Sequence, residues 1–399
     1  MQYSHKRKMI PRGFLFSAVE AAIKKPGRKD LALIYSATES NMAGVFTTNT
    51  VKAAPVCVDI SKIQSGKGQA IIINSGNANA CTGKKGMRDA MEMTRLVAQG
   101  LKLKPSRVYI SSTGVIGSPL PMERIRTRMH DLLAGLGKFS IHDVAHAIMT
   151  TDTFPKVISR TVEMNGKTGT ITGICKGAGM ICPHMATMLC FLMTDIAVNQ
   201  RTLDKALRDA VKRSLNRITV DGDMSTNDTV LIMANGMLGN PVITGKSKSY
   251  RVFQDVLSDV TYELSKLIAR DGEGATKFIE IEVKGARSET DAERVAFSVA
   301  NSNLVKTALY GNDANWGRIM AALGYSGISL AEEKIDIYFG KVNVVRRGLS
   351  NEMDEEANKV LRGKDIQIVI NLHLGRSSAR VLTCDLTEEY IRVNATYRT

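Results

Sequence analysis

The residue pair Ala186-Thr187 has the ingredients of a self-activating nucleophile. A threonine hydroxyl is a weak nucleophile, but cleavage of the chain in front of it would give the same residue an α-amine that can act as its base. The small Ala186 precedes the bond to be cut, and Gly177 and Gly179 upstream would tolerate a bent approach. The alternative is that Thr187 is a packed β-branched side chain, because it lies in the apolar block 185–193, which has the length of a buried strand.

Three other stretches accompany this one, and together they resemble a known family. They are 74–83 (Asn-Ser-Gly-Asn-Ala-Asn-Ala-Cys-Thr-Gly), 112–117 (Ser-Thr-Gly-Val-Ile-Gly) and 394–399 (Asn-Ala-Thr-Tyr-Arg-Thr). With the segment 176–195 they are similar to the ornithine acetyltransferase family, also called the glutamate N-acetyltransferase or arginine-biosynthesis bifunctional family. The similarity runs from Pro11 to the last residue in the family's order.

The resemblance implies an α/β (α+β) fold, namely a layered αββα-type sandwich with a smaller C-terminal α+β domain. It also implies autocatalytic cleavage at Ala186-Thr187. Residues 1–186 would form an alpha chain with the N-terminal part of the sandwich, and residues 187–399 a beta chain that starts at the nucleophile. Within the beta chain, residues from about 278 to 399 would form the smaller domain, whose tail returns to the site. Two alpha and two beta chains are expected to assemble into a heterotetramer.

The family reaction moves an acetyl group from N-acetyl-L-ornithine to L-glutamate through an acetyl-threonine. By resemblance, Thr187 attacks the acetyl carbonyl while its α-amine takes the proton. The resemblance also implies that the Thr113 hydroxyl and the Gly114 amide form the oxyanion hole. Without it, Thr113-Gly114 would be interpreted as an ordinary turn at the end of a strand.

The family pattern places substrate contacts at six positions: Thr153, Lys176, Thr187, Glu273, Asn394 and Thr399. A zwitterionic amino acid that leaves water needs a partner of opposite charge for its carboxylate and another for its ammonium group. Our hypothesis is that Lys176 meets the substrate α-carboxylate and that Glu273 meets an ammonium group. Asn394 and Thr399 would close the pocket, and the alternative for them is a frayed C-terminus.

The resemblance implies no cofactor and no metal. Acetyl-coenzyme A enters only as a second acetyl donor in bifunctional members, and no motif in the sequence selects between the two kinds. The loop from Asp221 has the odd-numbered oxygen ligands of a calcium loop but lacks its glycine and its glutamate, because those positions are Thr226 and Ile232. We therefore expect that loop to serve structural hydrogen bonding near the site.

Composition favours a globular protein. The chain has 399 residues, of which 44% are hydrophobic, which suffices for two or more packed units. The net charge of +15 raises nucleic acid as a partner, but the basic residues are dispersed and only 5% of residues are aromatic, so we expect no nucleic-acid binding. The six cysteines lack a CxxC pair, and no apolar run reaches membrane-spanning length. These features predict a cytoplasmic protein with no membrane partner.

Two alternatives to the acetyltransferase are a basic nucleic-acid-binding protein and a related self-processing aminopeptidase. The aminopeptidases use a serine nucleophile, so Thr187 between Ala186 and Met188 argues against them.

Hydrophobic periodicity predicts alternating strands and helices in the first two thirds and a reset near residue 278. Expected strands are 30–36, 69–74, 108–112, a hairpin over 157–172 turning at Asn165-Gly166, 218–220, 229–233, 279–283, 334–345, 366–374 and 379–386. Expected helices are 85–99, 122–136, one from Ser140 with Asp143 completing a capping box, one capped by Asn199, 250–270 and 294–300.

Overall fold

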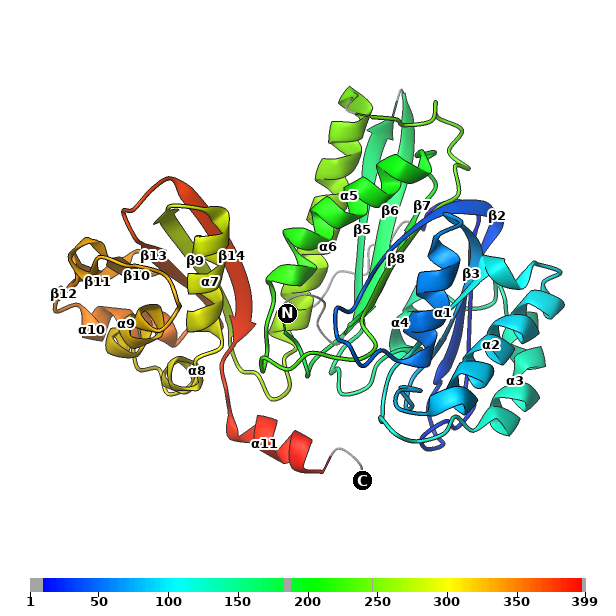
Figure 1. Ribbon diagram of the computed structural model, residues 1–399, viewed down its shortest axis with the longest axis horizontal. Coiled ribbons are helices and arrows are strands. Elements are labelled where there is room, and N and C mark those ends of the chain that lie inside the picture. The colour runs from blue at the N-terminus through cyan, green and yellow to red at the C-terminus, as the bar shows by residue number, and fades with distance from the viewer. Residues whose placement is uncertain (1–9, 165, 183–187, 246, 397–399) are drawn as a thin grey trace. The chain divides into compact units, whose positions relative to one another are not determined.

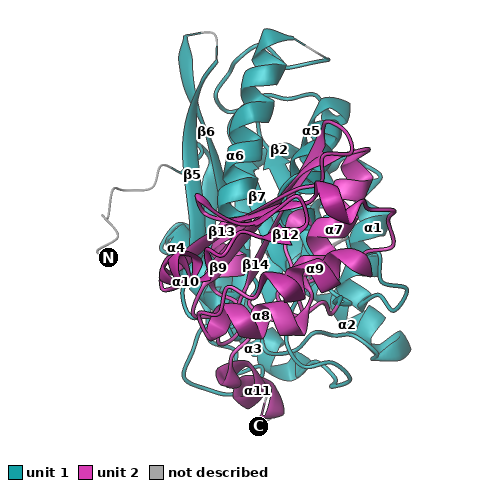
Figure 2. Cartoon of the chain, turned by 90° about the vertical axis from the view of Figure 1, so that its left-hand side faces the viewer, with its two compact units in different colours: residues 1–177, 184–216, 224–264 teal, residues 178–183, 217–223, 265–399 magenta. Residues whose placement is uncertain are grey.

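The computed structural model describes residues 10–164, 166–182, 188–245 and 247–396 (Figure 1). The chain divides into two compact units (Figure 2). Unit 1 comprises residues 1–177, 184–216 and 224–264, and unit 2 comprises residues 178–183, 217–223 and 265–399. Both units are discontinuous in sequence, so chain order alone does not reveal the division.

Unit 1 is built on an eight-stranded sheet in the order β4-β3-β2-β8-β7-β6-β5, with β1 paired to β2 off this path. The strands are β1 (Phe14–Val19), β2 (Leu31–Phe46), β3 (Lys67–Asn74), β4 (Val108–Ser112), β5 (Lys156–Met164), β6 (Lys167–Lys176), β7 (Leu189–Thr194) and β8 (Thr229–Ala234). The pairs β3–β4 and β7–β8 are parallel, whereas β6 runs antiparallel to both β5 and β7. The expected hairpin is confirmed by the β5–β6 pair.

The long strand β2 joins the two halves of this sheet. Its first part pairs with β1 and β3, and its second part pairs with β8, with a shift of register between Tyr35 and Ser40. Such irregularities bend a strand. Side chains from both halves, among them Ile71 on β3 and Phe191 on β7, belong to one buried cluster. The sheet therefore folds over into two facing layers with a shared core.

Helices cover the outer face of each layer, on opposite sides of unit 1 in Figure 1. Helices α1 (Ala54–Ile63), α2 (Gly83–Gly100) and α3 (Met122–Ala134) lie on one side, and α2, α3 and β3 contribute Met93, Ile125 and Ile72 to one cluster. On the other side lie α5 (Gln200–Lys212) and α6 (Lys248–Arg270), where Gly173 on β6 leaves room for Leu264. The predicted αββα layering is confirmed.

Two helix starts follow from local side-chain chemistry. The side chain of Ser140 accepts from the Asp143 N–H and the Asp143 carboxylate binds the Ser140 N–H, which confirms the capping box of α4 (Ile141–Ala147). Asn199 caps α5 through the Arg201 N–H, as predicted. The predicted strand 218–220 is wrong, because this segment forms only an isolated bridge between Ile218 and Leu382.

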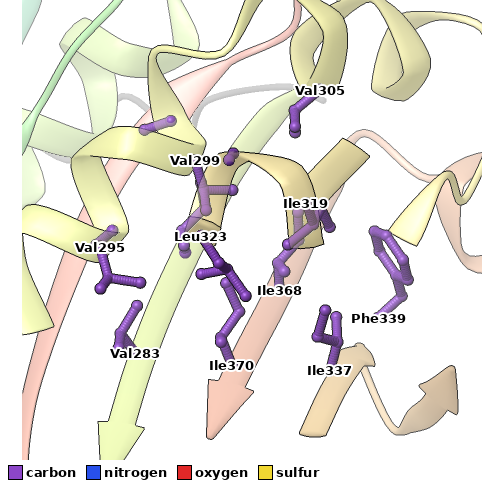
Figure 3. Packing of buried hydrophobic residues seen from close by; sticks show 14 of the residues in the cluster. Val283, Val295, Val299, Val305, Ile319, Leu323, Ile337, Phe339, Ile368 and Ile370 are labelled. Atoms are coloured by element: carbon purple, nitrogen blue, oxygen red, sulfur yellow. The ribbon is translucent and has the colours of Figure 1, made fainter. Parts of the chain in front are cut away.

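Unit 2 has a six-stranded sheet in the order β12-β11-β10-β13-β9-β14. Its elements are β9 (Phe278–Ala286), α7 (Glu289–Ala300), α8 (Asn303–Tyr310), α9 (Trp316–Gly324), β10 (Asp336–Phe339), β11 (Val342–Arg346), β12 (Leu349–Ser350), α10 (Asp354–Leu361), β13 (Asp365–Asn371), β14 (Ser377–Cys384) and α11 (Glu388–Ala395). Figure 3 shows Val283 and Ile368 of the sheet packed with helix residues such as Val295 and Leu323.

The structure corrects the prediction of one continuous strand over 334–345. The chain turns at Gly340, which has φ +57, and forms the two paired strands β10 and β11. The helices α8 and α9 were not predicted, although Ser302 and Asn315 cap them through their side chains. No helix within the described residues is long and apolar enough to cross a membrane.

Candidate active site

The predicted oxyanion residues Thr113 and Gly114 lie in the loop that follows β4. Gly114 has φ +136, and a Cβ atom there would lie 2.2 Å from the Gly76 carbonyl carbon and 2.4 Å from the Asn77 nitrogen. Both atoms belong to the backbone, so a side chain at position 114 would push two loops apart. Glycine is therefore required for the close approach of these loops, and the backbone of Gly114 has a fixed position.

Asparagine side chains hold this loop against the segment 74–83. The Asn74 amide donates to the Asn77 carbonyl at 2.9 Å and accepts from the Ser112 hydroxyl at 2.5 Å. Asn227 donates to the carbonyl oxygens of Ala78 at 2.6 Å and Ser112 at 2.8 Å. The asparagine-rich stretch that carried part of the family resemblance therefore holds the loop of Thr113 and Gly114 in place.

Lys176 ends β6 and reaches the same loop. Its ammonium lies 3.4 Å from Thr113 Oγ1 and 4.0 Å from Asp152 Oδ2, and its side chain is 3% exposed. The other oxygen of Asp152 binds the Lys156 ammonium at 2.7 Å and the Gly177 N–H at 2.7 Å. The Asp152 carboxylate is thus paired with two buried ammonium groups in this part of unit 1.

Asp152 is a strongly perturbed acid. Burial by itself would raise the pKa of its carboxyl, but the Lys176 and Lys156 ammonium groups outweigh burial and hold that pKa well below its ordinary value. Asp152 therefore stays ionised and fixes the position of Lys176. The sequence analysis did not identify Asp152. A carboxylate in the loop between a helix and a strand could have indicated it, because that strand begins with a lysine.

A second group of predicted residues belongs to unit 2. The Asn394 amide on α11 donates to Glu273 Oε2 at 2.8 Å, and the Glu273 N–H donates to the Ala178 carbonyl at 2.8 Å. A Cβ atom on Gly179 would lie 2.2 Å from the Glu273 carboxylate, so the absence of a side chain there makes room for Glu273. The described C-terminal segment up to residue 396 therefore ends in a helix that contacts Glu273.

Asp221 ties down the chain segment that precedes the expected cleavage point. Its carboxylate accepts from the N–H groups of Met180 at 2.6 Å and Ile181 at 2.9 Å, and from the Tyr390 hydroxyl at 3.3 Å. Burial raises the pKa of Asp221, and burial with the neighbouring Asp221 charge raises the pKa of Tyr390. The expected structural role of this loop is confirmed for Asp221.

The ArgJ family model matches residues 15–399. This chain belongs to the ArgJ family. It is 55% identical to the arginine biosynthesis bifunctional protein ArgJ of Geobacter sulfurreducens, and the match covers 98% of this chain and 100% of that protein. It is 49% identical to the ArgJ protein of Caldanaerobacter subterraneus, and this match covers 98% of each chain. The crystal structure of the Bacillus halodurans ArgJ protein matches with a TM-score of 0.51 and 43% identity, over 52% of this chain and 98% of the solved chain. The predicted family and fold class are confirmed.

In this ArgJ-family chain the structure brings some of the predicted residues together. Thr113, Gly114 and Lys176 meet in unit 1, and Glu273 contacts Asn394 in unit 2. Thr153 follows Asp152 directly and is exposed. Ala186, Thr187 and Thr399 lie outside the described residues, as does Asn165 of the predicted hairpin turn.

Proposed function

We propose that this ArgJ-family protein is a glutamate N-acetyltransferase that moves the acetyl group of N-acetyl-L-ornithine to L-glutamate in arginine biosynthesis. The observation that carries the proposal is the meeting of the buried Lys176 and Thr113 side chains beside the half-buried backbone of Gly114 in unit 1. This group combines a hydrogen-bond donor for a tetrahedral oxyanion with a cation for a carboxylate. The 55% identical Geobacter relative is named an arginine biosynthesis protein, which agrees with the proposal.

In this mechanism Thr187 Oγ1 attacks the acetyl carbonyl carbon and its proton passes to the residue's own α-amine. The tetrahedral oxyanion accepts hydrogen bonds from the Thr113 hydroxyl and the Gly114 N–H. The C–N bond then breaks, and the α-amine gives its proton to the departing ornithine nitrogen. The glutamate amine attacks the resulting acetyl ester, and Thr187 Oγ1 leaves and recovers a proton. The α-amine exists only after cleavage at Ala186-Thr187, so the uncut chain should not transfer acetyl groups.

We further propose that the products of cleavage, residues 1–186 and 187–399, remain associated and pair into a heterotetramer. Strand β6 belongs to the first product and β7 to the second. The two strands are paired, with Ile171 opposite Thr194 at one end and Lys176 opposite Leu189 at the other. In addition, Asp221 of the second product binds two N–H groups of the first. The half-length chain in the Bacillus halodurans crystal structure, of which 98% aligns with 52% of this chain, supports a two-chain product.

For substrate recognition we propose that Lys176 binds the α-carboxylate and Glu273 an ammonium group, with Thr153, Thr187, Asn394 and Thr399 as further substrate contacts. Asp152 supports the assignment of Lys176, because its carboxylate lies 4.0 Å from the Lys176 ammonium and pairs with it inside unit 1. The chemistry needs no cofactor, and acetyl-coenzyme A would serve as a second donor if the protein is bifunctional. We also propose a cytoplasmic location, since no disulfide joins the six cysteines, all of which are described.

The deciding experiment is denaturing electrophoresis and N-terminal sequencing of purified protein beside a Thr187→Ala variant. We expect two fragments from the wild type, the second beginning Thr-Met-Leu-Cys, and one uncut chain from the variant. Acetyl transfer should then be assayed with N-acetylornithine and glutamate, and with acetyl-coenzyme A as the donor. A fully active wild type that consists of one unbroken chain would refute the proposal.

A further inference from the structure

Asp228 binds the peptide group that directly follows Thr187. Its Oδ1 accepts from the Met188 N–H at 3.0 Å, and this nitrogen is bonded to the carbonyl carbon of residue 187. On the other side of Met188, its carbonyl accepts from the Thr229 N–H at 3.1 Å. The start of β7 is therefore held at both its N–H and its C=O by two consecutive residues, Asp228 and Thr229.

The sheet explains how Asp228 reaches this position. Strands β7 and β8 are parallel and in register, with Leu189 opposite Thr229, so the residues just before them are also neighbours (Figure 1). On the other side of β7, Lys176 pairs with Leu189. Asp228 and Lys176 thus flank the start of β7 from the two adjacent strands.

The second carboxylate oxygen of Asp228 is unusual. Asp228 is 0% exposed, and its Oδ2 has no hydrogen-bond partner in the part of the chain that is described. The Thr47 hydroxyl donates to the Ser225 carbonyl, whereas the Ser225 hydroxyl accepts from the Asn227 N–H and keeps its own proton, and both hydroxyls act to lower the pKa of Asp228. Buried polar atoms without partners are rare and call for a role.

Burial favours the neutral form of this acid. It raises the pKa of Asp228 well above the ordinary value, and the Met188 N–H and the Lys176 ammonium oppose this only in part. A neutral carboxyl accepts at one oxygen and donates at the other. An asparagine side chain has the same arrangement of one acceptor and one donor group.

We propose that Asp228 is a positioning residue for the acyl transfer, which holds the start of β7, directly after Thr187, through the hydrogen bond from the Met188 N–H to its Oδ1. The inference rests on the proposed function, in which Thr187 is the nucleophile. Asp228 acts through the backbone and leaves the binding of the substrate carboxylate to Lys176. Its removal should therefore lower kcat and the rate of self-cleavage while KM changes little.

The test compares Asp228→Ala and Asp228→Asn with matched changes at Asp59. Asp59 is also a buried carboxyl with a raised pKa that accepts from one strand N–H, that of Ile110 at 3.0 Å. We expect Asp228→Ala to lower kcat and the self-cleavage rate about 100-fold, as a small misplacement of a reacting group does, with KM within about threefold. Asp228→Asn should stay within about fivefold of the wild type, and Asp59→Ala should lose thermal stability without this loss of kcat.

Hydrogen exchange provides a second measurement that does not depend on activity. In NMR spectra of protein labelled at the methionine nitrogens, the Met188 N–H should exchange faster in Asp228→Ala than in the wild type, in Asp228→Asn or in Asp59→Ala. Unchanged exchange, or an Asp228→Ala variant with the wild-type kcat, would overturn the inference. An Asp228→Asn variant as slow as Asp228→Ala would also overturn it, by showing that the carboxyl must ionise. An uncut or inactive wild type would instead refute the proposed function.

Discussion

The Lys176 ammonium donates to the Thr113 hydroxyl oxygen over 3.4 Å. An ammonium has no acceptor, so Thr113 Oγ1 must be the acceptor in this pair and its own O–H remains available as a donor. A hydroxyl whose oxygen is bound in this way is oriented before any substrate arrives. Lys176, which is proposed to bind substrate, thereby orients the hydroxyl of Thr113, which is proposed for the oxyanion hole.

Replacement of Thr113 by valine tests this orientation. Thr113→Val keeps the shape of the side chain but removes the donor, and should lower kcat for acetyl transfer about 100-fold, since the loss of one oxyanion donor costs about 3 kcal/mol. Thr113→Ser should retain most of the activity. Steady-state kinetics with N-acetylornithine decide the matter, and equal activities of the two variants would remove Thr113 from the oxyanion hole.

Gly114→Ala should block both self-cleavage and transfer. The added Cβ would lie 2.2 Å from the Gly76 backbone and push the oxyanion loop out of position. Gly117→Ala is the matched control, because Gly117 also has a positive φ, +83, but its Cβ would meet nothing within 4 Å. The control should cost about 1 kcal/mol of stability and remain cleaved. The measurement is the cleaved fraction on a denaturing gel, and equal cleavage of both variants would contradict the prediction.

Lys176→Ala should raise KM for N-acetylornithine by about 10- to 100-fold, since a hydrogen bond to a charged group contributes about 1.5–3 kcal/mol. Lys167→Ala is a control on the same strand, where an exposed lysine at the other end of β6 binds the Gly239 carbonyl at 2.8 Å. Its KM should equal that of the wild type. An unchanged KM in Lys176→Ala would withdraw the assignment of the α-carboxylate to this residue.

Glu273→Gln should raise KM for the amino-acid substrates by about tenfold or more, because it removes the charge that faces an ammonium. Glutamine keeps the size of the side chain and an oxygen for the Asn394 amide, so α11 should stay in place. Glu389→Gln on α11, which breaks only an exposed ion pair with Arg392, serves as the control. The variants are distinguished by the Michaelis constants for N-acetylornithine and glutamate, each measured at a saturating concentration of the other substrate.

The pH dependence of stability should have opposite signs at Asp152 and Asp228. The pKa of Asp152 is held below its ordinary value, so its contribution is present above about pH 4 and is lost as the pH falls further. Asp152→Asn should therefore be less stable than the wild type at pH 7, with a difference that shrinks in acid. The pKa of Asp228 is raised, so Asp228→Asn should gain stability relative to the wild type as the pH rises above about 4. Urea unfolding midpoints from pH 3 to pH 8 test both signs.

Local chemistry made much of the fold predictable. The strand over 108–112, the caps at Ser140 and Asn199, and the hairpin from β5 to β6 all depend on residues a few positions apart. One error, at 218–220, fell where a short apolar segment has no such local pattern, whereas the turn at Gly340 and the helices α8 and α9 were missed despite local signals. The stretch 112–117 and the segment 176–195 were recognisable because their residue order is typical of the ArgJ family.

The sequence by itself determined which family this chain belongs to and which residues are candidates for nucleophile, oxyanion hole and substrate contact. Only the tertiary structure decided which partners hold them: Asp152 for Lys176, Asn394 for Glu273 and Asp228 for the peptide after Thr187. Asn394 and Glu273 are 121 positions apart, and Asp228 and Met188 are 40 apart. Contacts at such separations arise from strand register and burial, which no local pattern of residues encodes.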